Sequence, residues 1–278
     1  MPESTEYESE TPPLDLLTGA LCHYTSAQTA FDHILPSQSL RMSPYVRMRD
    51  PLENRELGFV SARPTGGDND EGRLLQMADL IQQVRRGMLL LSFSTDASRG
   101  YRRNDEPFMR GWARARMWEQ YAENHAGVCI VFKREPLLEA VRAGATDAGK
   151  VAAREVSYLP RGFADTDTHT VDLSRFNPFD LPGLARFVIE HQDDLFFVKA
   201  LDWEGEHEFR IVELPPEARS EQYKVVPFGG PSSIAAVIVG ERFPAWQLPG
   251  ARAVCDRLDV RLLQLDWRAG IPHALDVR

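Results

Sequence analysis

The segment from Trp203 to Val212, WEGEHEFRIV, has the residue types and spacing that are most typical of a chemical site. As a strand from Glu206 onward, it would place Glu206, Glu208 and Arg210 on one face, because successive side chains alternate. Two carboxylates this close repel each other, which raises the pKa of one of them. Such a pair could stabilise an oxocarbenium-like centre and move a proton, as cleavage of a glycosidic bond requires. The alternative is an ordinary solvent-exposed face, on which Arg210 offsets the repulsion instead of holding a phosphate.

A second candidate is His23-Tyr24-Thr25, in a strand predicted over residues 21–25. His23 and Thr25 would share one face of this strand and Tyr24 would lie on the other. A single histidine in such a position is more often structural than catalytic, so the segment alone favours no activity.

Three more segments carry weaker signals. A strand over residues 40–43, LRMS, precedes the turn Asp50-Pro51-Leu52-Glu53, which is typical of ordinary turn chemistry. The aromatic residues of the segment 117–122, MWEQYA, recur at helical spacing, which usually indicates core packing. Lys199, shortly before Trp203, is a weak ligand candidate.

Arginine is concentrated between residues 99 and 116, a stretch with six arginines whose only acidic residues are Asp105 and Glu106. The formal net charge of the whole chain is −9, so this positively charged stretch differs in sign from the chain as a whole. Arginine suits bidentate binding of phosphate or carboxylate, so the stretch predicts a site for an anionic ligand, nucleotide or nucleic acid. The alternative is a solvated helix face and loop. The six residues are Arg99, Arg102, Arg103, Arg110, Arg114 and Arg116.

Short strands are mixed irregularly with helices, of which three are predicted over residues 71–86, 111–124 and 184–200. This pattern favours an α+β fold with a mostly antiparallel, split sheet and helices packed around it. We predict a single domain over residues 19–270, between a flexible acidic tail at 1–18 and a C-terminal tail at 271–278. Phosphate-binding loops, dinucleotide fingerprints and metal-ligand spacings of histidine are absent from the sequence.

Composition places the chain among ordinary globular proteins, with 43% hydrophobic and 26% charged residues. No apolar run approaches the roughly 20 residues that cross a bilayer, and the acidic start is unlike a secretory leader. Cys22, Cys129 and Cys255 are too widely spaced for a metal clip, so we expect three reduced, buried thiols. We therefore expect a cytoplasmic protein without a metal.

Taken together, the motifs HYT, LRMS, DPLE, MWEQYA and EHEFR, in this order, resemble a widespread bacterial family catalogued as domain of unknown function 2971. The resemblance runs from about residue 20 to 240. One departure is Arg49, where the family usually has asparagine before Asp50-Pro51.

A more distant resemblance is to ADP-ribosyltransferase-like toxins, in which a strand with histidine opens the fold and a late strand carries the catalytic glutamate. It implies that NAD is the substrate and that Glu208 or Glu206 is catalytic. It further implies an NAD site, to which we assign His23, Tyr24, Thr25, Arg41, Ser43, Ser94 and Arg210. The strands of His23, Phe93 and Glu208 would then border one cleft. The expected function is that of a toxin or anti-phage defence effector acting on nucleic acid or protein, and the alternative is a non-catalytic module that senses a nucleotide or nucleic acid.

Overall fold

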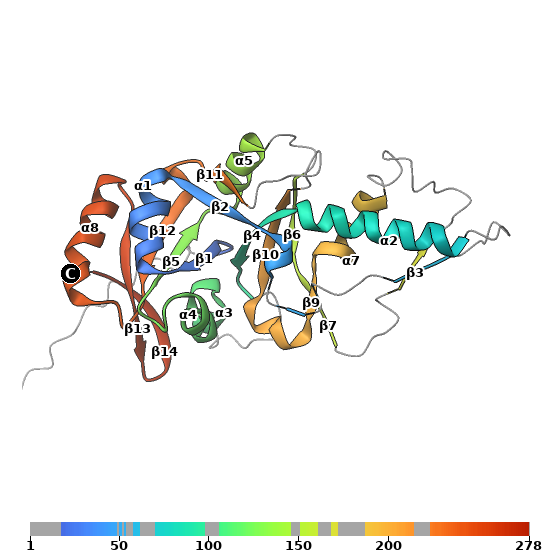
Figure 1. The fold of residues 1–278 in the computed structure, drawn as a ribbon. Coiled ribbons are helices and arrows are strands. Elements are labelled where there is room, and N and C mark those ends of the chain that lie inside the picture. Colours follow the sequence, from blue (N-terminus) through green and yellow to red (C-terminus); the bar gives the residue numbers. More distant parts are fainter. Residues whose placement is uncertain are drawn as a thin grey trace, which may run out of the picture. The chain divides into compact units, whose positions relative to one another are not determined.

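The computed structural model describes residues 18–48, 50–51, 53, 58–61, 70–97, 106–145, 151–160, 168–171, 187–213 and 223–277. The chain divides into two compact units, each assembled from segments that are far apart in the sequence. The first unit comprises Met1–Ser39, Ser94–Leu137 and Phe228–Arg278, and the second comprises Leu40–Phe93 and Leu138–Pro227. Figure 1 shows the helices and strands of both.

A sheet with mainly antiparallel pairing forms the centre of the first unit. Its strands follow one another in the order β1 (Leu21–Thr25), β5 (Val128–Phe132), β12 (Ile234–Val239), β13 (Leu262–Arg268) and β14 (Ile271–Asp276). All of these pairs are antiparallel except β12 with β13. Strand β5, VCIVF, is buried along its whole length, as expected for a continuous apolar run inside a sheet.

Helices cover this sheet. They are η2 (Thr29–Ile34), α1 (Leu35–Ser37), α3 (Glu106–Met109), η5 (Gly111–Ala113), α4 (Ala115–Tyr121), η9 (Pro231–Ser233), η10 (Ala245–Gln247) and α8 (Leu248–Arg257). Helix α4 packs against β1, α8 against β13 and α3 against β14 (Figure 1). The hydroxyl of Ser26 accepts a hydrogen bond from the N–H of Thr29, the first residue of η2.

A tight left-handed turn follows α4. Glu123, Asn124 and His125 have φ angles of 49°, 53° and 68°, a conformation that costs non-glycine residues about 1–2 kcal/mol each. A residue distant in the sequence stabilises the turn, since the carbonyl of His125 accepts a hydrogen bond from the backbone N–H of Arg242. Gly240 lies so close that a Cβ on it would be 2.0 Å from that carbonyl oxygen. Only glycine fits there without a backbone shift.

The second unit contains a sheet and a long helix. Among the described residues the sheet order is β11 (Lys224–Pro227), β2 (Ser39–Pro44), β4 (Leu89–Ser94), β10 (Glu208–Glu213) and β6 (Val151–Glu155). Two small parallel pairs are β3 (Gly58–Ser61) with β8 (Thr168–Val171), and β7 (Ser157–Leu159) with β9 (Val198–Ala200). The helices are η3 (Tyr45–Arg47), α2 (Asp70–Gly87), α7 (Gln192–Phe196), η8 (Leu201–Glu206) and most of α5 (Arg134–Gly144).

An apolar core lies beneath α2. Met77 and Ile81 face inward at helical spacing and pack with Tyr45, Leu90 and Phe196. Tyr45 meets Phe196 edge to face, with ring centroids 5.7 Å apart. Strands β4 and β10 contribute Leu90 and Val212 to this core.

The predicted α+β class with mostly antiparallel strands is confirmed. Strand β1 and helix α2 agree closely with their predicted ranges. The single domain over residues 19–270 stays a prediction, since the two units are compact separately.

Three local predictions are wrong. The helix over 111–124 is broken because Arg114 is extended, with φ −87° and ψ 103°. The helix over 184–200 gives way to strand β9, so Lys199 is a strand residue. Residues 271–276 are strand β14 rather than a tail, joined to β13 by a two-residue turn at Ala269-Gly270 with φ angles of 51° and 80°. Alanine is an unusual first residue for such a turn, which is why the hairpin is not evident in the sequence.

Candidate functional site

Strand β10 carries two of the predicted site residues, Glu208 and Arg210. Both are buried and lie on the same face, as the alternation of a strand predicts. Glu206 differs, because it is the last residue of η8, and His207 after it has φ 42°. The prediction of a strand beginning at Glu206 is therefore wrong, since the left-handed His207 turns the chain before β10.

The guanidinium of Arg210 is completely buried and donates to acceptors of the protein itself. Its Nε and Nη2 atoms each lie 2.8 Å from an oxygen of Glu208, which makes this a bidentate ion pair. Nη2 also donates to Oε1 of Glu53, and Nη1 lies 2.8 Å from the carbonyl oxygen of Phe196. Arg210, predicted as a ligand of NAD, therefore bridges two carboxylates of the second unit.

Lys199 brings the other predicted carboxylate to the same place. Its Nζ atom is 2.5 Å from Oε2 of Glu206 and 3.2 Å from Oε2 of Glu208. The same Nζ lies 4.7 Å from the centre of the Trp203 ring, within cation–π range. Glu206 and Glu208 therefore meet as predicted, but around a lysine and in the interior instead of on a solvent-exposed face.

The turn at residues 50–53 completes this arrangement. Oδ2 of Asp50 accepts a hydrogen bond from the N–H of Ala200 at 2.6 Å, and Glu53 pairs with Arg210. The backbone carbonyl of Glu53 accepts a further hydrogen bond from Arg85 of α2. The prediction of ordinary turn chemistry at these residues is therefore wrong. A signal was present, because an arginine inside the apolar strand FRIV requires compensating carboxylates.

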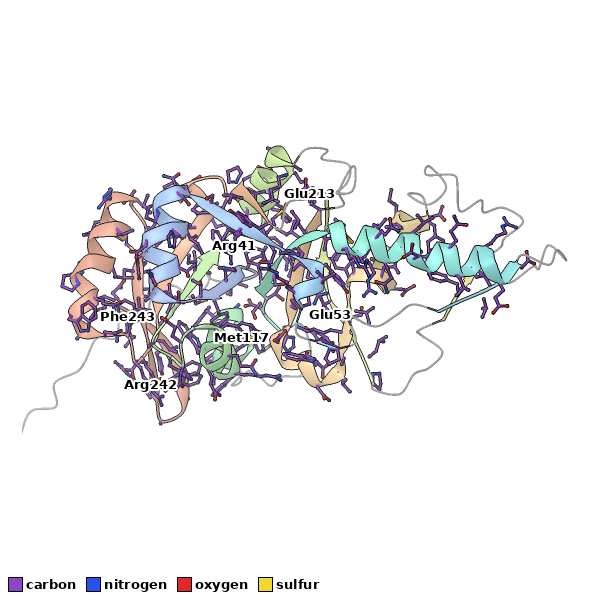
Figure 2. The ribbon with its side chains drawn as sticks, viewed as in Figure 1. Arg41, Glu53, Met117, Glu213, Arg242 and Phe243 are labelled. Atoms are coloured by element: carbon purple, nitrogen blue, oxygen red, sulfur yellow. The ribbon has the colours of Figure 1, made fainter. Side chains whose placement is uncertain are left out.

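We refer to these residues as the buried charge cluster: Asp50, Glu53, Arg85, Lys199, Glu206, Glu208 and Arg210. None of them is more than 5% exposed. Formally the cluster holds four carboxylates against three cations. Figure 2 labels Glu53 and, well apart from it in the same unit, Glu213.

Opposing effects determine the pKa of Glu208. Burial raises it, but Arg210 and, to a smaller extent, Lys199 and Ser92 outweigh burial and lower the pKa to about 2. Glu208 is therefore ionised throughout the physiological range. The predicted repulsion, which would have raised a pKa in this pair, is outweighed at Glu208 by the two cations.

Glu53 has the opposite electrostatic behaviour. Burial raises its pKa to about 7, since the attraction of Arg210 does not outweigh the loss of solvation and the negative charge of Glu208 raises the pKa further. Two carboxylates that share one arginine thus titrate far apart, which is the pattern that distinguishes a fixed charge from a proton carrier in enzymes.

The carboxylate of Glu208 already has a full set of partners. Oε1 accepts from Ser92 at 2.6 Å and from Arg210, and Oε2 accepts from Lys199 and Arg210. Its backbone N–H donates to the hydroxyl of Tyr158 at 2.8 Å, and burial raises the pKa of that hydroxyl. Glu208 can therefore act through its charge without accepting a further hydrogen bond.

Two more predicted NAD ligands lie in β2 of the second unit. Arg41 is exposed, and its guanidinium carbon is 5.9 Å from the centre of the Tyr223 ring. Ser43 is half-buried and lies opposite Leu90 of β4. Neither is a member of the buried charge cluster, and their binding roles stay predictions.

The remaining NAD candidates belong to the first unit. In β1, Tyr24 is buried, while His23 and Thr25 are half-buried, so the predicted alternation is confirmed. The hydroxyl of Tyr24 donates to the carbonyl of Gly111 at 2.6 Å. Ser94 is buried opposite Cys22. The cleft shared by the strands of His23, Phe93 and Glu208 stays a prediction, because His23 and Glu208 belong to different units.

The arginine-rich stretch is only partly described, and Arg99, Arg102 and Arg103 lie outside the described residues. Arg110 is buried and its Nη1 lies 2.9 Å from Oδ2 of Asp96. The same carboxylate accepts hydrogen bonds from the N–H groups of Gly19 and Gly111. Arg114 donates to the carbonyl of Thr95 at 2.7 Å, and the half-buried Arg116 donates to Gln120 at 3.4 Å. Arg110 and Arg114 thus bind the protein's own acceptors, and an anionic ligand at this stretch stays a prediction.

Membrane-spanning helices and metal sites are both absent from the described ranges. None of the helices there is long and apolar enough to cross a membrane. Within the same ranges, no group of three or more histidine, cysteine, aspartate and glutamate residues could hold a metal ion.

Neither a curated protein nor a solved structure matches the chain. One family model does match, and the matched residues run from α4 through the cluster residues Lys199, Glu206, Glu208 and Arg210. Residues 117–211 are thus similar to the family described as protein of unknown function (DUF2971), the family that the motifs of the sequence indicate.

Proposed function

We propose that the protein is an ADP-ribosyltransferase-like enzyme that uses NAD, and that the buried charge cluster of the second unit supports its chemistry. The observation that carries this proposal is the state of Glu208, a buried carboxylate kept ionised by Arg210 and Lys199. When the bond between nicotinamide and ribose breaks, the ribose carbon becomes positively charged. A fixed negative charge in a site of low dielectric constant stabilises such a transition state.

The reaction proposed is a substitution at the ribose carbon. The carbon–nitrogen bond breaks and its electron pair stays on the nicotinamide nitrogen. An oxygen or nitrogen atom of an acceptor, or of water, then bonds to the ribose carbon and loses its proton. In this scheme Glu208 acts through its charge, because its oxygens already accept four hydrogen bonds.

A second candidate is a non-catalytic module that senses a nucleotide or a nucleic acid. It is favoured by the completeness of the contacts around Glu208 and by the zero exposure of Arg210, since a saturated ion-pair network is also what a purely structural interior requires. In this reading the cluster fixes the fold of a binding surface and takes part in no reaction.

The discriminating experiment measures free nicotinamide after incubation of the purified full chain with NAD. We expect release by the wild type and a loss of about a hundredfold or more in Glu208→Gln, which keeps the shape of the side chain but removes its charge. Glu213→Gln is the matched control, because Glu213 is also a buried glutamate of β10 but pairs with Lys224 outside the cluster. Circular dichroism establishes that both variants are folded.

The opposite results are equally informative. NAD binding in calorimetry without any nicotinamide release from the wild type would refute the enzyme and favour the binding module. Equal release by Glu208→Gln and Glu213→Gln would remove Glu208 from the chemistry.

A further inference from the structure

Glu53 has an oxygen that no contact explains. Its side chain is completely buried, and Oε1 accepts a hydrogen bond from Arg210. Oε2 has no hydrogen-bond partner among the described residues, although it is shielded from solvent. Both oxygens of Glu208, the other carboxylate of Arg210, are by contrast doubly hydrogen-bonded. A buried acceptor without a hydrogen bond costs folding free energy. An oxygen without a partner inside an ionic network therefore calls for a physical explanation.

A proton on Oε2 lowers this cost, because a buried neutral carboxyl loses less solvation than a buried carboxylate. Oε1 is occupied by the guanidinium, so a proton that neutralises Glu53 has its place on the other oxygen. Burial raises the pKa of Glu53 to about 7, so this proton comes and goes near neutral pH while Glu208 keeps its charge. The structure thus contains one carboxylate that titrates and one that does not, joined by a single arginine.

The groups around Glu53 determine what this proton changes. Tyr45 of η3 interacts with the charge of Glu53, and Arg85 of α2 donates to its backbone carbonyl. Asp50 belongs to the same turn, and its carbonyl accepts a hydrogen bond from the N–H of Glu53. Lys199 of β9 and Glu208 and Arg210 of β10 act on Glu53 through their charges. Next to them, Glu206 of η8 pairs with Lys199, and the hydroxyl of Tyr158 of β7 accepts a hydrogen bond from the N–H of Glu208. With every carboxylate ionised, four negative charges face the three cations Arg85, Lys199 and Arg210. The formal charge of the cluster is then −1, and it becomes zero when Glu53 is protonated.

We propose that Glu53 is a positioning residue whose ionisation sets the negative charge available at Glu208. When Glu53 is ionised, Arg210 is shared between two carboxylates and Glu208 is left incompletely neutralised. When Glu53 carries its proton on Oε2, Glu208 is the only ionised carboxylate that pairs with Arg210, so its negative charge is neutralised more completely. This inference rests on the proposed function, in which the negative charge of Glu208 stabilises the ribose cation.

The first test follows the rate of nicotinamide release between pH 5 and pH 9. In the wild type we expect a rise of about a hundredfold with a single midpoint near neutral pH, as one essential ionisation produces. Glu53→Gln, which is neutral at every pH, should stay at the low rate and lose the midpoint. Glu53→Asp should restore a midpoint, and Glu213→Gln should keep that of the wild type. A midpoint that survives in Glu53→Gln would overturn the proposal.

The second test is independent of activity and follows the carboxyl carbons of glutamate by NMR in the full chain. We expect one carboxyl signal with a midpoint near neutral pH that disappears in Glu53→Gln and persists in Glu213→Gln. Absence of such a signal from the wild type would overturn the proposal. If the signal is present but no form releases nicotinamide at any pH, the proposed enzyme fails and the assignment of Glu53 as the titrating carboxyl of the cluster stands.

Discussion

Among the described residues, the largest fully buried side chain of the first unit is Trp118, and that of the second unit is Arg210. Trp118 meets Tyr24 edge to face, with ring centroids 5.2 Å apart, and its indole N–H donates to the carbonyl of Trp112. Arg210 instead bonds two carboxylates and a carbonyl. Around Trp118 the core consists of neutral side chains, including Cys22 and Cys129, whereas seven charged residues form the cluster of the second unit.

This contrast separates two motifs that both combine aromatic and charged residues in the sequence. The aromatic motif MWEQYA places Trp118 in a core, where geometry and apolar area determine its energy. The motif EHEFR places charges in an interior, where each ion is stable only while its partners remain. Chemistry that needs a fixed charge of low pKa therefore has a candidate site in the second unit, and the described core of the first unit is a packing core.

The largest effect is expected from removing the central cation of the second unit. Arg210→Met leaves Glu53 and Glu208 buried without their shared partner, which should lower the free energy of unfolding by about 3–5 kcal/mol. Arg154→Met is the control, since Arg154 is 42% exposed, belongs to the same unit and pairs with an exposed aspartate. It should cost less than about 1 kcal/mol. Chemical denaturation of both variants measures the difference, and equal small losses would show that the cluster does not stabilise the unit through Arg210.

The next effect concerns the pH dependence that such a cluster must have. The pKa of Glu53 is about 7 in the folded protein against an ordinary value of 4.5, so the folded state binds this proton more tightly. The resulting stability is complete below pH 4.5 and is lost as the pH rises towards 7, an effect of up to about 3 kcal/mol. Glu208 has the opposite sign, since its stabilisation is present above pH 4.5 and is lost as the pH falls towards 2.

Denaturation between pH 4.5 and 8 therefore tests Glu53 separately from Glu208. Relative to the wild type, Glu53→Gln should lose the decline in stability over this window, and Glu213→Gln should retain it. The core of the first unit provides no equivalent carboxylate in the described residues. A decline of the same size in Glu53→Gln would mean that other groups cause it.

The sequence predicts one side of the cluster better than the other. Alternation along β10 places Glu208 and Arg210 on one face, and Lys199 joins Glu206 to Glu208, because these residues are local in the chain. Glu53 and Asp50 bond Arg210 and Ala200 across 157 and 150 residues, and no local pattern contains such a contact. In the fold, the long periodic helix α2 is predictable, whereas the break at Arg114 and the hairpin at Ala269-Gly270 depend on individual backbone conformations.

A smaller effect is expected where the first unit depends on shape. A Cβ at residue 240 would lie 2.0 Å from the carbonyl oxygen of His125, so Gly240→Ala forces a backbone shift. We expect a loss of about 1–3 kcal/mol, independent of pH between 5 and 8. Gly250→Ala is the matched control, because its Cβ would meet nothing within 4 Å inside helix α8, where alanine should stabilise by up to about 1 kcal/mol. A pH-dependent loss in Gly240→Ala would contradict the view that this part of the unit depends on packing alone.

The smallest effect concerns a single charged group in the first unit that has no cluster around it. Oε2 of Glu123 accepts a hydrogen bond from the N–H of Ala27 at 2.9 Å, at the start of the helical segment that contains η2. This resembles a helix cap, so Glu123→Ala should cost about 1 kcal/mol, well below the loss in Arg210→Met. Glu119→Ala removes an exposed carboxylate of α4 and should change the free energy of unfolding by less than about 0.5 kcal/mol. Hydrogen exchange of the Ala27 amide, faster in Glu123→Ala and unchanged in Glu119→Ala, measures the cap directly. If Glu123→Ala were as damaging as Arg210→Met, a carboxylate that bonds one backbone N–H would matter as much as the centre of an ionic cluster, and the contrast between the two units would fail.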